Sequence, residues 1–265
     1  MKDDMADAAP VQTAPEDPWK ALRRFTAARI ALGRAGASLP TEALLAFNLA
    51  HAQARDAVHT PLDTAALKCE LDSRALDSIE VSSAAQSREQ YLRRPDLGRR
   101  LDSKSTARLS DHGRASESRP ELVFVVADGL SSSAVALHAI PLIERTIARL
   151  QGWQIGPIVV ATQARVAIGD PIGELMQAGM VAVLIGERPG LSSPASLGVY
   201  LTYRPATGCS DAQRNCISNV RPEGLGYDAA AFKLAHLLDA ARTRKLTGIG
   251  LKDESVWEGD VLPAR

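Results

Sequence analysis

The feature that most constrains the fold is an alternation of short apolar runs and helical patterns in the second half of the chain. Four runs have the β-branched and apolar composition of buried strands: residues 121–127, 158–161, 180–185 and 197–203. Three segments have the apolar spacing of helices: residues 131–150, 170–178 and 228–246. Short apolar strands separated by helices predict an α/β fold with a mostly parallel sheet that helices cover on both faces.

The loops after these strands are the predicted ligand-binding segments, because ligands of such sheets bind beyond the carboxyl ends of the strands. They are residues 128–133, 162–170, 186–193 and 204–210. The Asp-Gly-Leu-Ser-Ser-Ser sequence from Asp128 is compatible with simple helix capping or with polar groups aimed at a ligand. A serine hydrolase built on Ser131 or Ser132 is disfavoured, because the turn lacks Gly-x-Ser-x-Gly and the histidines follow no recognisable order.

The first half of the chain predicts helices and less regular segments. Residues 1–18 carry acidic residues and prolines without the apolar run of a signal peptide, which predicts a disordered, cytoplasmic tail. Residues 19–81 form the predicted N-terminal helical region, with helices that end near His59 and Leu76. In residues 82–119 nine basic side chains face five acidic ones and apolar residues thin out, which predicts a basic linker or arm before the α/β domain of residues 120–265.

Composition argues against several function classes. Lysine plus arginine and aspartate plus glutamate number 31 each, so no net charge favours nucleic acid or an anionic membrane as partner. No apolar run approaches the roughly 20 residues that cross a bilayer, and the glycine-rich motifs of dinucleotide and nucleoside triphosphate sites are absent. The cysteines, Cys69, Cys209 and Cys216, form no Cys-x-x-Cys pair, which argues against a disulfide framework or a structural zinc site and favours a reducing compartment.

Three short segments carry glycine, proline or polar residues where a ligand would dock: Arg165–Asp170 (RVAIGD), Gly186–Leu191 (GERPGL) and Arg214–Asn219 (RNCISN). Judged by spacing alone, they fit ordinary turns as well as a binding site. Four motifs resemble, in sequence and order, the small subunit of ethanolamine ammonia-lyase: Arg93–Leu101 (RRPDLGRRL), Val125–Ser131 (VVADGLS), Gly186–Leu191 (GERPGL) and Cys216–Asn219 (CISN). The resemblance spans most of the chain after Leu39.

The resemblance implies one subunit of an adenosylcobalamin-dependent radical enzyme that converts ethanolamine to acetaldehyde and ammonia in ethanolamine catabolism. It implies a large partner subunit, a TIM barrel that carries the catalytic residues, in a large hetero-oligomer that some bacteria package in a microcompartment. For this chain it implies a Rossmann-like domain that binds base-on cobalamin, with contacts at Val166, Glu187 and Cys216. Neither a catalytic residue nor a metal ligand is then expected here.

These residue types suit a corrin, whose rim alternates methyl groups with amide side chains. Val166 can pack against methyl groups, an ionised Glu187 can accept a charge-assisted hydrogen bond from an amide, and Cys216 is small enough for close approach. An alternative that the residues leave open is a stand-alone Rossmann-like module that binds a nucleotide or another corrinoid. Co-purification with a much larger chain distinguishes the two.

Overall fold

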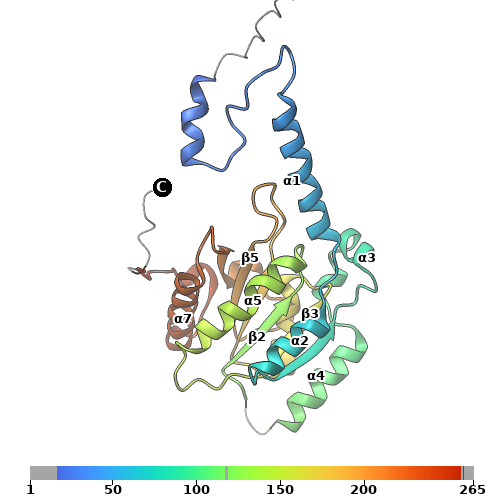
Figure 1. The fold of residues 1–265 in the computed structure, drawn as a ribbon. Coiled ribbons are helices and arrows are strands. Elements are labelled where there is room, and N and C mark those ends of the chain that lie inside the picture. The colour runs from blue at the N-terminus through green and yellow to red at the C-terminus, as the bar shows by residue number, and fades with distance from the viewer. Residues whose placement is uncertain (1–16, 117–118, 258, 260–265) are drawn as a thin grey trace, which may run out of the picture. The chain divides into compact units, whose positions relative to one another are not determined.

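The structure, a computed structural model, describes residues 17–116, 119–257 and 259, and its contacts divide the chain into residues 1–53 and 54–265. The first unit contains a 3₁₀ helix, η1 (Pro18–Phe25), and most of α1 (Thr41–His59) (Figure 1). The helix expected to end near His59 is therefore confirmed. The predicted tail falls almost entirely on residues 1–16, outside the described part of the chain.

The second unit is built on a six-stranded sheet in the order β1-β3-β2-β4-β5-β6. Its strands are β1 (Ser78–Ser82), β2 (Leu122–Ala127), β3 (Ile158–Thr162), β4 (Met180–Gly186), β5 (Leu197–Tyr203) and β6 (Arg214–Val220). The first four are mutually parallel, whereas β5 runs antiparallel to β4 and β6. An α/β fold with a mostly parallel sheet is confirmed. The strand order and the antiparallel pairings differ from those of a Rossmann sheet, so the structure does not confirm the predicted Rossmann-like topology.

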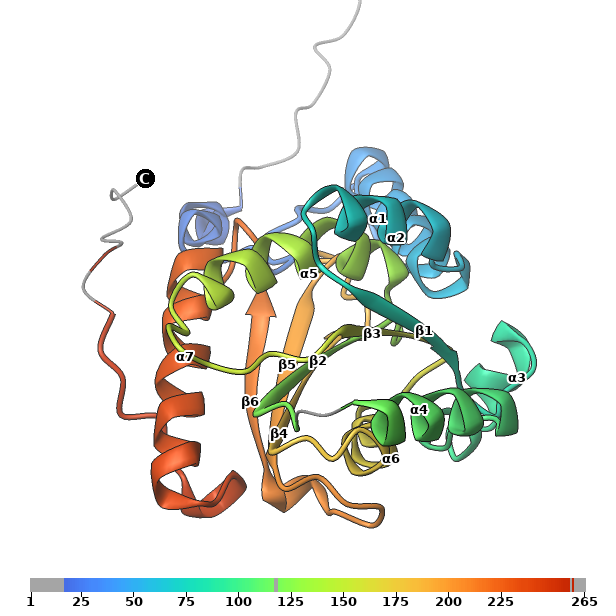
Figure 2. The ribbon, with the colours of Figure 1, turned by 90° about the horizontal axis from the view of Figure 1, so that it is seen from below.

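Helices cover both faces of the sheet (Figure 2). One face, here called the α5 face, packs against α2 (Thr64–Ser73), α5 (Ser132–Ile147) and α7 (Tyr227–Arg244). The other, the α6 face, packs against α4 (Ser103–Ala115) and α6 (Gly169–Leu175). Every residue of β2 and β4 is buried between these layers, which is why both strands are continuously apolar in the sequence.

The described part of residues 82–119, which omits 117 and 118, is not the extended arm that its composition predicts. They form α3 (Arg88–Arg93), η2 (Leu97–Arg99) and α4. Asp102 caps α4 by accepting from the Ser105 amide at 2.6 Å, and Leu109 of α4 is fully buried against the sheet. Few apolar residues suffice here, because only one stripe of a short surface helix faces the core. The sheet also begins before residue 120, since β1 lies within the region predicted to be helical.

Two further expectations change because β5 is antiparallel. Its carboxyl end lies at the opposite edge of the sheet from those of β2, β3 and β4, so residues 204–210 leave the sheet at that other edge. Arg214 links them to the predicted segment that ends at Asp170, because it contacts both the Cys209 carbonyl and Asp170. Residues 214–219, expected as a loop, form most of β6 and pair with β5. Exposed polar side chains interrupt β6, which hides the strand from a search for apolar runs.

A close approach of two glycines joins the turn after β2 to the end of β4. Gly129 has φ of 56°, in the left-handed region, and the Gly186 oxygen accepts from the Leu130 amide at 2.9 Å. A Cβ on Gly186 would overlap the Ser131 carbonyl, and one on Gly129 would overlap the Gly186 carbonyl. Neither position has room for a side chain, so glycine is required at both.

Gly186→Ala is therefore expected to lower the free energy of unfolding by about 2 kcal/mol or more, because backbone rather than a flexible side chain must move. Gly190→Ala is the matched control, since its Cβ would meet only ordinary contacts at 3.7 and 4.0 Å. Urea unfolding of the full chain, followed by circular dichroism, measures both. Equal stability of the two variants would contradict the close packing described here.

Candidate functional site

The carboxyl edge of the sheet has a topological switch point between β2 and β3. The chain leaves β2 for α5 on one face and leaves β3 for α6 on the other, while β2 and β3 are neighbours. Such points open a crevice between the diverging loops. Three of the predicted segments, residues 128–133, 162–170 and 186–193, follow parallel strands at this edge.

Asp128 is the buried carboxylate at the switch point. Its Oδ1 accepts from the Ala164 amide at 2.9 Å, and its Oδ2 accepts from the Gln163 amide at 2.9 Å and from Arg88 Nη1 at 3.0 Å. Burial raises the pKa of Asp128 above its ordinary value, although these donors oppose the shift. Asp128 thus ties the end of β2 to the loop that carries Val166, so its role is to hold this loop rather than to cap α5.

Tyr91 of α3 supports the same loop. Its hydroxyl donates to the Ala164 carbonyl at 3.0 Å, and the guanidinium groups of Arg88 and Arg165 lie 4.9 and 4.5 Å from its ring centroid. The Arg165 amide also donates to the Gly98 carbonyl at 2.8 Å. Val166, the first residue of η3 (Val166–Ile168), follows directly and packs against the core on the α6 face while remaining partly exposed.

Glu187 lies at the end of β4 on the same face. Its Oε2 accepts from the Ser196 hydroxyl at 2.5 Å, and the Asn219 amide lies 3.3 Å from each carboxylate oxygen. Gly198 leaves room for this side chain, since a Cβ there would lie 3.1 Å from Glu187 Oε1 and 3.4 Å from the Tyr200 ring. Glu187 thus joins the end of β4 to the segment before β5 and to the end of β6.

Cys216 is in the middle of β6, opposite Tyr200 of β5, which itself pairs with the α6-face residue Val183. The thiol is exposed, not buried as a small core residue would be, and its Sγ lies 3.2 Å from the Ser218 hydroxyl. Burial, followed by the neighbouring Cys216, raises the pKa of Tyr200 to about 12. Val166, Glu187 and Cys216 thus share the α6 face, around a half-buried Tyr200.

A buried ion pair links two of the predicted segments. Arg214 Nη1 and Nη2 each lie 2.7 Å from an oxygen of Asp170, and both side chains are almost fully buried. Arg214 also donates to Thr202 Oγ1 and to the Cys209 carbonyl, both at 2.9 Å. Burial alone would lower the pKa of Arg214, but the bonds to Asp170 raise it above its ordinary value. This pair holds β6, with Cys216, against α6, which follows Val166.

The sequence alone does not predict these roles of Asp128, Asp170 and Arg214. All three lie within the short segments singled out from the sequence, but nothing in those segments indicates which side chains they contact. The sequence does not reveal that Asp170 pairs with Arg214, because the two side chains meet only when β6 adds to the sheet.

The serine hydroxyls after β2 have structural partners. Ser131 Oγ donates to the Pro194 carbonyl at 2.9 Å and accepts from the Ala134 amide at 3.3 Å as the cap of α5. Ser132 Oγ donates to the Thr60 carbonyl at 2.7 Å. His138 is instead beside Tyr227, with 2.8 Å between Nδ1 and the hydroxyl. No serine and histidine pair of a hydrolase forms at this turn.

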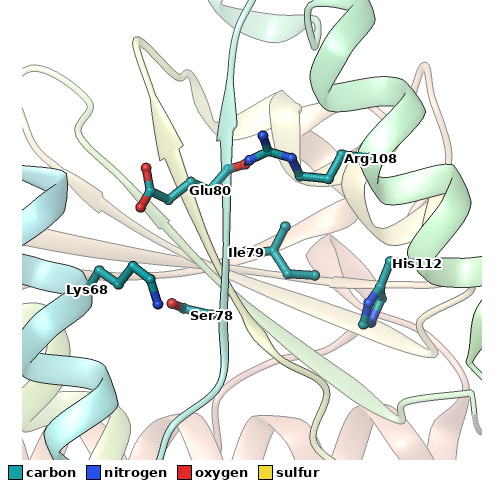
Figure 3. Close-up of a pocket in the computed structure, with 6 residues that line it drawn as sticks. All are labelled: Lys68, Ser78, Ile79, Glu80, Arg108 and His112. Carbon is teal, nitrogen blue, oxygen red and sulfur yellow. The ribbon is translucent and has the colours of Figure 1, made fainter.

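A groove of about 410 Å³ follows the exposed edge of β1, away from these residues. In Figure 3 Lys68, Ser78 and Glu80 lie on one side of the strand, and Ile79 and His112 lie on the other. Lys68 Nζ is already bound to Asp72 at 3.0 Å, and Arg108 donates to the Glu80 carbonyl at 2.6 Å. The two cationic side chains of this groove thus already bind groups of the protein itself.

Two searches for other kinds of site gave no candidate in the part of the chain that the structure describes. No group of three or more His, Cys, Asp and Glu side chains there could hold a metal ion. No helix among the same residues is long and apolar enough to cross a membrane.

Comparison with known proteins agrees with the resemblance of the motifs. Residues 16–252 match the family described as ethanolamine ammonia-lyase light chain. A protein named ethanolamine ammonia-lyase small subunit from Azotobacter vinelandii is 56% identical over 253 residues, which cover 95% of this chain and 93% of the relative. Relatives with the same name from Ralstonia nicotianae and Pseudomonas fluorescens are 56% and 53% identical over 91% and 93% of this chain and 90% of each relative.

Arg214→Met is expected to lower the free energy of unfolding by about 3–5 kcal/mol, because it leaves the Asp170 carboxylate buried without its partner. The double variant Asp170→Leu with Arg214→Met should recover a large part of that loss, since no charge then stays buried. Urea unfolding of the full chain measures both. A double variant as unstable as the sum of its single variants would show that the two charges are not coupled.

Proposed function

The chain belongs to the ethanolamine ammonia-lyase light chain family, and from this premise we propose that it helps to bind adenosylcobalamin as the small subunit of that enzyme. The proposed reaction is the radical conversion of ethanolamine to acetaldehyde and ammonia in ethanolamine catabolism. The observation that supports cofactor binding most directly is the position of Val166, Glu187 and Cys216 on one face of the sheet, although they are far apart in the sequence.

The residues on this face fit a corrin. Val166 and the Tyr200 ring offer partly exposed apolar surface for ring methyl groups. Glu187 Oε1 has only the long contact to the Asn219 amide, so it retains lone pairs for an amide N–H of the cofactor. The exposed Cys216 side chain is small and leaves space for close approach. Binding of the base-on form requires no ligand to cobalt from these residues.

The contribution of this chain is binding and orientation. Adenosylcobalamin, when bound, supplies the radical chemistry, and the protein supplies its position and its protection from solvent. Glu187 would fix the rotation of the ring by accepting a hydrogen bond at its rim, while Val166 and Cys216 would cover its face. We propose that the catalytic residues lie on a large partner subunit, a TIM barrel, in a cytoplasmic hetero-oligomer that can be packaged in a microcompartment.

Co-expression with the candidate large subunit tests the assembly. We expect the two chains to co-purify as one complex that converts ethanolamine to acetaldehyde when adenosylcobalamin is added. The small subunit alone should show no turnover. A chain that stays alone in solution, and binds a nucleotide or a corrinoid without a partner, would support the stand-alone binding module instead.

Glu187→Ala is expected to weaken cobalamin binding by the assembled enzyme about 10-fold or more, because a hydrogen bond to a charged group contributes about 1.5–3 kcal/mol. Assembly is expected not to change, because the substitution leaves the pairing of β5 with β4 and β6 intact. Titration followed by the cobalamin absorption spectrum measures the affinity. Glu144→Ala is the matched control, because Glu144 lies on α5 on the opposite face. An unchanged affinity of Glu187→Ala would remove this residue from the site.

A further inference from the structure

Three buried polar atoms at the switch point have no hydrogen-bond partner: Arg88 Nη2, Gln163 Oε1 and Arg165 Nε. Buried polar atoms are nearly always paired with protein, water or ligand groups, so these three atoms mark a place where a polar ligand could bind. The charges are also unbalanced. Arg88 pairs with Asp128 at 3.0 Å, but the Arg165 guanidinium has no carboxylate within ion-pair distance among the residues that the structure describes.

The Arg165 guanidinium is nevertheless held in place. Its group lies 4.5 Å from the Tyr91 ring centroid, and its backbone amide is bound to Gly98. A Cβ on Gly98 would lie 3.0 Å from Arg165 Cγ, so glycine there makes room for the side chain. Asp128 and Tyr91 fix the neighbouring Ala164. A cation fixed in a partly buried position without a counter-charge is costly, and binding of an anion would offset that cost.

The surroundings of Arg165 restrict the class of anion. Val166, the next residue, is a proposed corrin contact. Val166 packs on the α6 face, so an anion bound by Arg165 would belong to a ligand that also reaches this face. The corrin side chains of cobalamin are neutral amides, whereas its nucleotide loop carries a phosphodiester, which a planar guanidinium can bind through two parallel hydrogen bonds.

We propose that Arg165 binds the phosphodiester of the nucleotide loop of cobalamin, beside the corrin contact at Val166. This inference rests on the proposed function, because it assumes that the assembled enzyme binds a corrinoid. Tyr91 and Asp128 act as positioning residues. Tyr91 holds the guanidinium. Asp128 neutralises Arg88, so of the two guanidinium groups beside Tyr91 that of Arg165 is the one without a carboxylate partner among the described residues.

The test compares two ligands on the assembled enzyme: cyanocobalamin, and dicyanocobinamide, which lacks the phosphodiester, ribose and base. Arg165→Met should weaken cyanocobalamin binding about 10-fold or more, as expected for a lost hydrogen bond to a charged group, and should change cobinamide binding less than about 2-fold. Arg165→Lys should recover part of the affinity, because it keeps the charge without the planar fork. Arg94→Met is the matched control, since Arg94 is exposed and paired with Asp96 at 2.8 Å.

A second measurement applies even if cobinamide binds too weakly to titrate. The ³¹P resonance of bound cyanocobalamin should shift from its free position in the wild-type enzyme and lie closer to it in Arg165→Met. Equal losses for both ligands would show a contact to the corrin, and unchanged affinities would show no contact; either result overturns the proposal. Loss of assembly in Arg165→Met would overturn it in favour of a carboxylate from the large subunit. A wild-type enzyme that binds neither ligand would contradict the proposed function itself.

Discussion

The buried ion pair between Asp170 and Arg214 is the interaction on which the candidate site depends. Two charged groups are removed from water, and their bidentate geometry, together with the Thr202 hydroxyl and the Cys209 carbonyl, leaves few of their hydrogen-bonding groups unpaired. Such a pair contributes little net stability over apolar residues, but it permits few alternative arrangements. The ion pair therefore mainly fixes the position of β6, because β6 cannot shift along β5 without separating Arg214 from Asp170 of α6.

Asp128 has the corresponding role at the switch point. One carboxylate binds two backbone amides of the loop after β3 and the guanidinium of Arg88, so three segments distant in sequence meet at one side chain. Tyr91 adds a second tie to the same loop. The two clusters hold the site from different directions: Asp128 holds the loop before Val166, and Asp170 holds the strand that carries Cys216. Binding surfaces built on such supports change little in shape when a ligand binds.

Much of the sheet domain could be predicted from local pattern. The strands β2, β3, β4 and β5, together with α5, α6 and α7, lie close to the segments expected from apolar runs and helical spacing. The failures have a common cause. Residues 82–119 bury only a narrow stripe on short helices, and β1 and β6 are edge strands with polar residues among the apolar ones. Strands buried on both faces read as continuous apolar runs, whereas strands buried on one face carry polar residues between the apolar ones and give no such run.

The sequence by itself determined the class of fold, the buried strands at the centre of the sheet and, through the wording of its motifs, the family. Only the tertiary structure decided which motif residues touch each other. The direction of β5 moved residues 204–210 to the far edge, and β6 brought Arg214 to Asp170 and Cys216 to the face that carries Val166. The physical reason is that strand pairing and buried charge pairing join residues many positions apart, whereas sequence patterns report only each residue's local environment.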